Sequence, residues 1–301
     1  MRRLFAPFVG TFTVIMIAGY WYMASRLNLS GVGWFLLGIP CFLQWIVPIV
    51  YWVWDRKKVT PIDDAVHFSS YTSMGILSFL FLAVVSRDLL LLISGFLFSG
   101  PSMLAGDFGA NVALLGSFLA VGIGMKKAMA GPKVEVVEIP YEQLDPAFSD
   151  LSIVQISDLH VGPTIGRRYV QSVVDKTKAL QPDYIVLTGD IIDGSVELLR
   201  HAVEPLGELP KVAPCYFVLG NHEYYAGAAP WLEHFTSLGI KTLCNEFEVV
   251  EHRDGKVIFG GVTDPVAEKF TPDQRPAPAE AYGPKDVTGP VFRVLLAHNP
   301  K

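Results

Sequence analysis

The sequence is poor in cysteine, and its few cysteines form no recognisable pattern. Only three occur in 301 residues, Cys41, Cys215 and Cys244, widely spaced and without a CxxC pair. This usage excludes a disulfide framework and a zinc-ribbon site as the basis of the fold. The sequence also has no internal repeat.

The C-terminal part lacks the positive charge that nucleic-acid binding requires. Residues 131–301 carry fifteen Lys and Arg against twenty-four Asp and Glu, a formal charge of −9. Residues 1–130 carry nine against five, a formal charge of +4. An acidic domain argues against nucleic acid as a partner. The contrast between the two parts predicts two domains, at 1–130 and 131–301.

Long apolar runs dominate the first part. Hydrophobic residues make up 51% of the chain, its mean hydropathy is +0.37, and four runs stand out, at 4–23, 33–54, 71–98 and 108–125. Each run is close to the ~20 residues that a helix needs to cross a bilayer. A cleaved signal peptide would give one short run, so the pattern predicts a membrane domain of about four transmembrane helices that acts as an anchor.

The third run contains two charges, Arg87 and Asp88, which would be costly at the centre of a membrane. It is either one long helix with a paired charge or a helix followed by a re-entrant segment. With four spans, most Lys and Arg fall on the side of the N-terminus, at Arg2, Arg3, Arg56, Lys57, Lys58, Lys126, Lys127 and Lys133. This bias predicts a multi-pass protein of the inner cell membrane with a cytoplasmic C-terminal domain. A fifth span would reverse that orientation.

The second part alternates between short apolar runs and amphipathic segments. The pattern predicts strands at 134–139, 151–157, 183–188 and 214–220, and helices at 166–180, 195–209 and 229–239. Further strand-like runs follow at 240–244, 247–252, 256–262 and 291–297, with a Pro- and Gly-rich loop at 271–290. Such alternation is typical of a layered α/β domain.

Polar side chains follow four of the predicted strands. They are Asp158 and His160, Asp190 and Asp193, Asn221 and His222, and finally His298. Each alone could be a turn or cap residue. Because ligands of open α/β sheets bind beyond the carboxyl ends of the strands, the joint pattern predicts one site. Oxygen and imidazole ligands suit Mn, Fe or Zn, and the preceding Gly189 and Gly220 allow a close approach of the backbone.

These motifs resemble those of a known family. The sequence reads SDLH at 157–160, GDIID at 189–193, GNHE at 220–223 and AHNP at 297–300. In this order they resemble the calcineurin-like binuclear metallophosphoesterases, and the membrane segments resemble a bacterial branch of that family. The resemblance implies a β-sandwich flanked by helices, two divalent metal ions, and hydrolysis of a phosphodiester or pyrophosphate bond.

The resemblance also implies roles for individual residues. Asp158 and His160 would bind the first metal, Asp190 would bridge both, and Asn221 and His298 would bind the second. His222 would face the substrate phosphate, and Asp193 would orient it. Glu223 is interpreted only as a charge at a helix start.

Some relatives in the wider family act in lipid A synthesis by cleaving the pyrophosphate of UDP-diacylglucosamine. A membrane anchor therefore suggests the lipid bilayer and a lipid-linked substrate as partners. The family closes its site with a G-H-x-H motif, which this sequence lacks. We therefore expect a chain truncated at its C-terminus. The alternative to an enzyme is a catalytically incomplete, membrane-anchored metal-binding or scaffold module.

Overall fold

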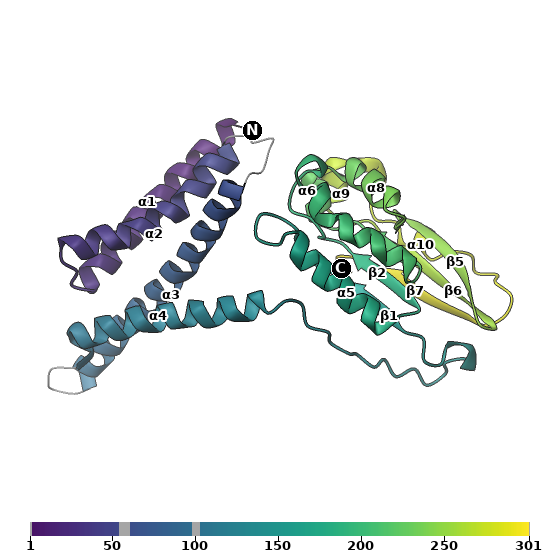
Figure 1. Cartoon of the computed structure of the whole chain (residues 1–301), viewed down its shortest axis with the longest axis horizontal. Coiled ribbons are helices and arrows are strands. Elements are labelled where there is room, and N and C mark those ends of the chain that lie inside the picture. Colours follow the sequence, from purple (N-terminus) through teal and green to yellow (C-terminus); the bar gives the residue numbers. More distant parts are fainter. Residues whose placement is uncertain (1, 54–60, 98–102, 301) are drawn as a thin grey trace. The chain divides into compact units, whose positions relative to one another are not determined.

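The computed structural model describes residues 2–53, 61–97 and 103–300 and divides the chain into two compact units, Met1–Ala130 and Gly131–Lys301 (Figure 1). The first unit is helical and the second is built from strands and helices. An α-helical region followed by an α/β domain is the predicted fold class, which is confirmed.

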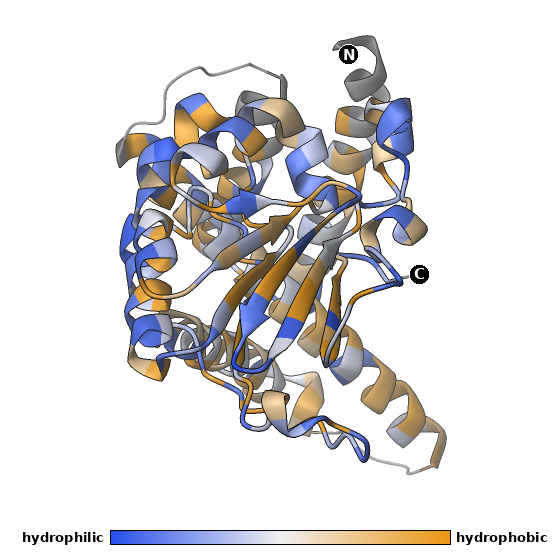
Figure 2. Ribbon diagram, turned by 90° about the vertical axis from the view of Figure 1, so that its right-hand side faces the viewer, coloured by the Kyte–Doolittle hydropathy of each residue, from blue (hydrophilic) through white to orange (hydrophobic). Residues whose placement is uncertain are grey.

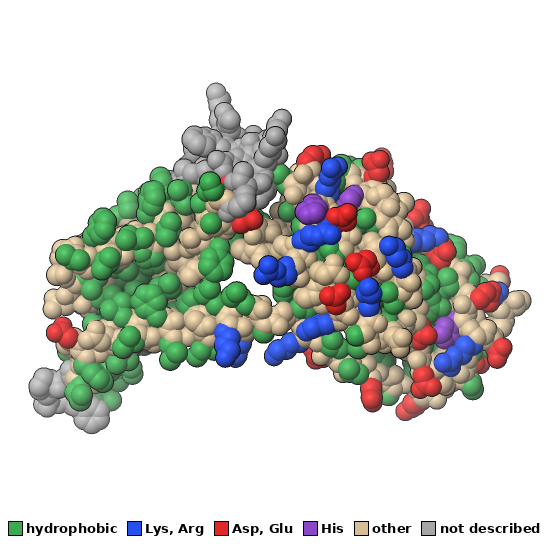
Figure 3. Space-filling view, in the orientation of Figure 1, with side chains coloured by type: hydrophobic (Ala, Val, Ile, Leu, Met, Phe, Trp, Pro, Cys, Tyr) green, Lys and Arg blue, Asp and Glu red, His purple; other side chains and the backbone are tan. Residues whose placement is uncertain are grey.

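Long helices make up the first unit. They are α1 (Arg2–Arg26), α2 (Gly31–Val53), α3 (Pro61–Leu97) and α4 (Asp107–Met129), with the short 3₁₀ helix η1 (Met103–Ala105) before α4. In the described residues, Ile62–Leu97 and Asp107–Met129 are long and apolar enough to cross a membrane, and α2 contains a shorter apolar stretch, Gly31–Val47. Hydrophobic side chains cover much of this unit's surface in Figure 3.

The third and fourth predicted spans therefore have the length and hydropathy that a helix needs to cross a membrane. The first and second predicted spans remain predictions. Several residues used for the predicted orientation, Arg56, Lys57 and Lys58, lie outside the described residues. So do the last residues of the runs at 33–54 and 71–98.

The charges of the third run lie within one continuous helix. The Asp88 carboxylate accepts a hydrogen bond from the Tyr22 hydroxyl at 2.8 Å and pairs with the guanidinium of Arg26 at 2.9 Å. Arg87 contacts the same carboxylate at 3.2 Å and donates to the Arg26 carbonyl at 2.7 Å. The ion pairs and hydrogen bonds of Arg87 and Asp88 offset the cost of removing these charges from water. The third run is therefore one long helix with a paired charge, and not a helix followed by a re-entrant segment.

The second unit contains two sheets. The first has the order β1 (Ile153–Ile156), β2 (Tyr184–Thr188), β3 (Cys215–Val218) and β4 (Lys241–Thr242), and all its neighbours are parallel. The second has the order β5 (Glu246–His252), β6 (Gly255–Gly261) and β7 (Val291–Leu296), antiparallel and then parallel. The helical elements are η2 (Pro146–Phe148), α5 (Arg167–Leu180), α6 (Val196–Val203), η3 (Glu204–Lys211), α7 (Asn221–Ala226), α8 (Ala228–Ser237), α9 (Ala267–Phe270), η4 (Pro272–Gln274) and α10 (Pro278–Ala281).

Strand β2 shows why the layers form. Its side chains alternate between two buried clusters, because successive residues of a strand point to opposite faces. Ile185 and Leu187 face the cluster that α5, α6 and α8 complete. Tyr184 and Val186 face the cluster shared with β6 and β7 of the other sheet. Helices, first sheet and second sheet are thus three layers with two apolar interfaces, and orange hydrophobic residues run along the strands in Figure 2.

Two local predictions are wrong. The segment 134–139 forms no strand in the part of the chain that the structure describes, although it alternates in sequence. An alternating pattern alone cannot form a strand, because a ladder needs a hydrogen-bonding partner. The predicted helix at 195–209 divides into α6 and the 3₁₀ helix η3. Pro205 explains the division, since it lacks an N–H group and its ring clashes with the preceding turn.

Trp231 connects the helix-side core to the loop after β2. Its ring is fully buried and stacks on Phe235, and its indole N–H donates to the Gly194 carbonyl at 2.9 Å. Gly194 directly follows Asp193. We expect Trp231→Phe to keep an aromatic core but lower the free energy of unfolding by about 1–3 kcal/mol, because the Gly194 carbonyl loses its partner. The change in the free energy of unfolding can be measured from the hydrogen exchange of β2 and β3 in the full chain during a urea titration. A free energy of unfolding equal to that of the parent chain would show that the hydrogen bond to Gly194 contributes nothing.

Candidate metal centre

The sheet topology brings the four sequence motifs to one place. Strands β1, β2 and β3 are parallel, so their carboxyl ends lie at one edge of the first sheet. Asp158, Asp190 and Asn221 follow those ends. His298 follows β7 of the second sheet, and its Nδ1 lies 2.9 Å from the Thr188 carbonyl at the end of β2. The two sheets therefore meet at the same edge.

Two glycines permit this convergence. A side chain at Gly220 would lie 2.2 Å from the Asp190 Oδ1 atom. A side chain at Gly189 would lie 2.6 Å from the Gly220 nitrogen, and Gly189 also has a φ of +85°. Any larger residue at either position would separate the loops after β2 and β3, so both glycines are required by close approach.

Three residues other than glycine adopt the left-handed backbone conformation here. Asp158, His160 and Asp190 have φ values of 53°, 48° and 52°. This conformation costs roughly 1–2 kcal/mol for most L-residues, although Asp tolerates it better. Strain of this kind concentrates at functional sites, where surrounding contacts enforce it.

Each of three histidines has its Nδ1 atom next to an acceptor. The Asp193 Oδ1 atom lies 2.8 Å from Nδ1 of His160 and 2.6 Å from Nδ1 of His222. Nδ1 of His298 faces the Thr188 carbonyl. Because a carboxylate and a carbonyl only accept, each Nδ1 carries the proton. In the neutral form of each ring, the Nε2 atom is then free to act as a ligand.

These Nε2 atoms converge on one carboxylate oxygen. The Oδ2 atom of Asp190 lies 3.8 Å from Nε2 of His160, 3.8 Å from Nε2 of His222 and 3.3 Å from Nε2 of His298. Asp190 is almost fully buried. Acceptors that face one another in this way repel unless a cation lies among them. The donor set therefore fits a metal ion.

Two overlapping groups could each hold an ion. One consists of His160, Asp190 and His222, and the other of Asp158, Asp190 and His298, with their ligand atoms within 4.8 Å of one another. Asp190 belongs to both, as the predicted bridging role requires. His222 is part of the first group of potential ligands, whereas the sequence predicts that it faces the substrate phosphate. Asn221, a predicted ligand of the second metal, is the first residue of α7 and directly precedes His222.

The electrostatic setting of His160 favours a positive charge. Burial lowers the pKa of His160, but the hydrogen bond and charge of Asp193 and the charges of Asp190 and Asp158 raise it, and the net shift is upward. The same carboxylates that favour a proton on His160 also favour a metal ion beside it.

Glu223 has a larger role than the sequence analysis assigned. Its side chain is fully buried, and its two oxygens accept four backbone N–H groups. The donors are Asp190 at 2.9 Å, Ile191 at 2.7 Å, Ile192 at 3.3 Å and Gly220 at 2.7 Å. Burial raises the pKa of this carboxyl, and the N–H groups oppose the rise. Glu223 thus joins the loops after β2 and β3. Glu223 lies three residues after Gly220, the N-cap of α7, which is the position from which a Glu side chain reaches back to the N-cap N–H, a signal available in the sequence.

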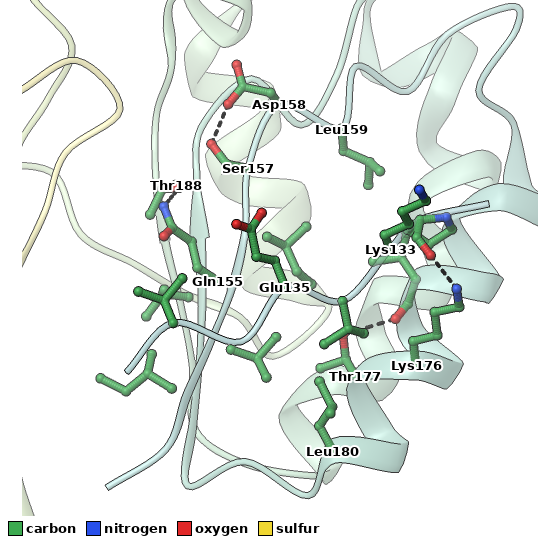
Figure 4. A pocket seen from close by; sticks show the side chains of 18 of the residues that line it. Lys133, Glu135, Gln155, Ser157, Asp158, Leu159, Lys176, Thr177, Leu180 and Thr188 are labelled. Atoms are coloured by element: carbon green, nitrogen blue, oxygen red, sulfur yellow. Dashed lines mark hydrogen bonds between the residues drawn. The ribbon is translucent and has the colours of Figure 1, made fainter. Parts of the chain in front are cut away.

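A cavity of about 960 Å³, lined by both apolar and polar side chains, lies beside the centre (Figure 4). It runs along β1 and β7 and is closed on one side by residues 132–139. Asp158 and His160 belong to its lining, as do Lys133 and Lys176. The cavity therefore offers apolar surface that begins at two predicted metal ligands.

We expect Glu223→Gln to loosen both loops. The amide would direct an NH₂ group at backbone N–H groups, and two of them would lose their acceptor, at a cost of about 1–3 kcal/mol. Hydrogen exchange at Asp190, Ile191 and Gly220 should accelerate. The matched control is Glu233→Gln, at an exposed position of α8. Equal exchange in the two variants would contradict the assigned role of Glu223.

Comparison with known proteins agrees with this geometry. Residues 151–286 match the family described as calcineurin-like phosphoesterase. A transmembrane protein with metallophosphoesterase domain from Danio rerio is 36% identical over 202 residues, 65% of this chain and 46% of that protein. An uncharacterized metallophosphoesterase from Helicobacter pylori is 31% identical over 196 residues, 64% of this chain and 49% of that protein.

A UDP-2,3-diacylglucosamine pyrophosphatase from Chlamydia muridarum is 37% identical over 75 residues, 25% of this chain and 23% of that protein. The matched segment is shorter than half of each of these three relatives. The motifs, their convergence on Asp190 and these similarities agree. Residues 151–286 are therefore a calcineurin-like phosphoesterase domain.

Proposed function

We propose that the protein is a membrane-bound, metal-dependent phosphohydrolase that cleaves a phosphodiester or pyrophosphate bond of a lipid-linked substrate. The observation that carries this proposal is the convergence of three imidazole Nε2 atoms on the Asp190 carboxylate. The match to the phosphoesterase family supports the reaction type. The similarity to a UDP-2,3-diacylglucosamine pyrophosphatase supports a pyrophosphate substrate of that kind.

Two divalent ions, Mn, Fe or Zn, would be held by Asp158, His160, Asp190, Asn221 and His298. Such ions neutralise the phosphate oxygens and lower the pKa of water. Asp190 belongs to both candidate groups and would set the spacing of the two sites.

His222 would act on the leaving group. Asp193 holds its Nδ1 proton, so its Nε2 atom points toward the centre. A protonated His222 could then donate from Nε2 to the leaving oxygen, a form of acid catalysis worth about 10²–10⁴-fold in rate. Asp193 also contacts His160, so it would position a ligand and the proton donor together.

The setting suggests a lipid substrate. Helices α3 and α4 are long and apolar enough to span a bilayer. The cavity beside β1 carries apolar side chains of β1 and β7 and reaches Asp158 and His160, so an acyl group bound against those side chains would lie close to the reacting phosphate. The positive charges flanking the predicted spans would keep the α/β domain on the cytoplasmic side of the inner membrane.

We expect Asp190→Asn to abolish metal binding, because it removes the charge shared by both groups. His222→Asn should retain metal but lower hydrolysis of a generic phosphodiester by about 10²-fold or more. Elemental analysis of protein purified in detergent with Mn²⁺, together with an activity assay, tests both. Asp254→Asn, in the turn between β5 and β6, is the matched control for charge.

Three outcomes separate the candidate functions. Metal lost from His222→Asn would make His222 a ligand rather than the proton donor. Metal bound to the parent chain without hydrolysis would favour the anchored binding module. Absence of metal from the parent chain would overturn both functions.

Metal uptake should fall as the pH is lowered. The folded apo-protein raises the pKa of His160, so its protonated form stabilises the apo-fold below the ordinary histidine pKa. That stabilisation is lost as pH rises through the raised pKa, where the neutral ring becomes available to metal. Asp193→Asn should shift the midpoint of metal uptake to lower pH, because it removes the hydrogen bond that raises this pKa. An unchanged midpoint in a Mn²⁺ titration at several pH values would contradict this account.

A further inference from the structure

Residues 132–141, which we call the strap, lie along the cavity beside β1 and β7. The strap has no helix or strand and follows Gly131, whose φ of +83° sets a bend in the chain. Strap residues line the cavity together with residues of β1 and β7 (Figure 4). An extended segment without a ladder therefore shares one cavity with two strands.

Both ends of the strap are attached to the domain. At its beginning, the ammonium group of Lys176 on α5 donates to the Pro132 carbonyl. At its end, the rings of Tyr141 and Phe292 meet edge to face, with their centroids 6.2 Å apart. Between these attachments the side chains are in water, and Ile139 is 82% exposed. The middle of the strap is therefore free to move while its ends stay in place.

Strand β7 has an open edge. It is the last strand of the second sheet, and the carbonyls of Pro290 and Leu296 accept N–H groups from the side of β6. Because alternate residues of a strand direct their main-chain groups to opposite sides, Arg293 and Leu295 direct theirs away from β6. An open edge of this kind readily accepts another strand.

The strap already has the side-chain period of a strand. Within 135–139, every second residue lines the cavity, namely Glu135, Val137 and Ile139, whereas Val136 and Glu138 do not. Alternation with a period of two is the property that lets one face of a strand be buried. The face that would be buried is thus the one already turned toward the cavity.

The contact between Tyr141 and Phe292 defines how the strap would pair with β7. Strap residues before Tyr141 and β7 residues after Phe292 line the same cavity, so the two segments run antiparallel. Ile139 would then lie opposite Val294. This register places the cavity-lining side chains of the strap on the same face as Phe292 and Val294, which pack against the core between the two sheets.

We propose that the strap closes onto β7 as a fourth strand of the second sheet and thereby covers the cavity. The main chain of Glu138 would bond that of Leu295, and Ile139 would leave water. Because the cavity reaches Asp158 and His160, the strap controls access to the metal centre from this side. The inference depends on the fold alone and holds whether or not the protein is a phosphohydrolase.

Disulfide trapping in the full chain in detergent tests the closure. In the proposed register, the Cα atoms of Ile139 and Val294 would be about 4.5 Å apart, within the range of a disulfide. We expect Ile139→Cys with Val294→Cys to form an intramolecular disulfide about tenfold faster than Val136→Cys with Val294→Cys. Val136 is the matched control because it is 80% exposed but belongs to the other face of the strap.

Two proline variants separate strand pairing from random motion of the strap. Glu138→Pro removes an N–H group that the ladder needs and should slow the Ile139–Val294 link by about tenfold. Val137→Pro removes an N–H group that points away from β7 and should slow it much less. Mass spectrometry of peptides from the oxidised protein identifies each link, so the natural cysteines can remain.

Three outcomes would overturn the inference. Equal rates for the two cysteine pairs would show that the strap has no preferred register on β7. Equal effects of the two prolines would show that no ladder forms. A link that joins two chains, seen as a dimer on a non-reducing gel, would show that β7 receives the strap of a second copy.

Discussion

The buried carboxylate of Glu223 holds together two loops that no sheet ladder connects. Its oxygens accept N–H groups from residues 190–192 after β2 and from Gly220 after β3. Those loops carry Asp190 and His222, and the N–H of His222 donates to Asp190 Oδ1 at 2.9 Å. The distances among the potential ligands therefore depend on a side chain that is not itself in either metal-binding group. A metal centre needs such support, because ligands left to move would not keep one geometry.

Asp193 has a similar role at the opposite side of the rings. One oxygen contacts Nδ1 of both His160 and His222, and those ring centroids are 4.6 Å apart. The two imidazoles are therefore coupled, and any displacement of Asp193 would move a potential ligand and the proposed proton donor together. Trp231 reaches this loop through the Gly194 carbonyl, so the helix-side core contributes to the geometry of the centre.

Much of the fold could be predicted from the sequence because it follows from local patterns. The buried strands around β2 and β3 are short apolar runs bounded by turn residues, and the helix at α5 has a clear amphipathic period. The polar residues after those strands come together because parallel strands share one edge. What could not be predicted depends on partners distant in sequence. The run at 134–139 has the alternation of a strand but no ladder, and Glu223 acquires its role only when the β2 loop packs over it.

The left-handed residues of the centre have a consequence for the stability of the domain. Asp158, His160 and Asp190 each adopt a conformation that glycine would tolerate at no steric cost. Replacement by glycine could relieve strain, by about 1 kcal/mol at each position, and would remove the ligand atom at the same time. Selection for stability and selection for the centre thus oppose each other at the same three residues. A glycine at any of these positions would raise the stability of the domain but remove a potential metal ligand. Backbone strain at these three residues is therefore a mark of a domain that retains its metal ligands.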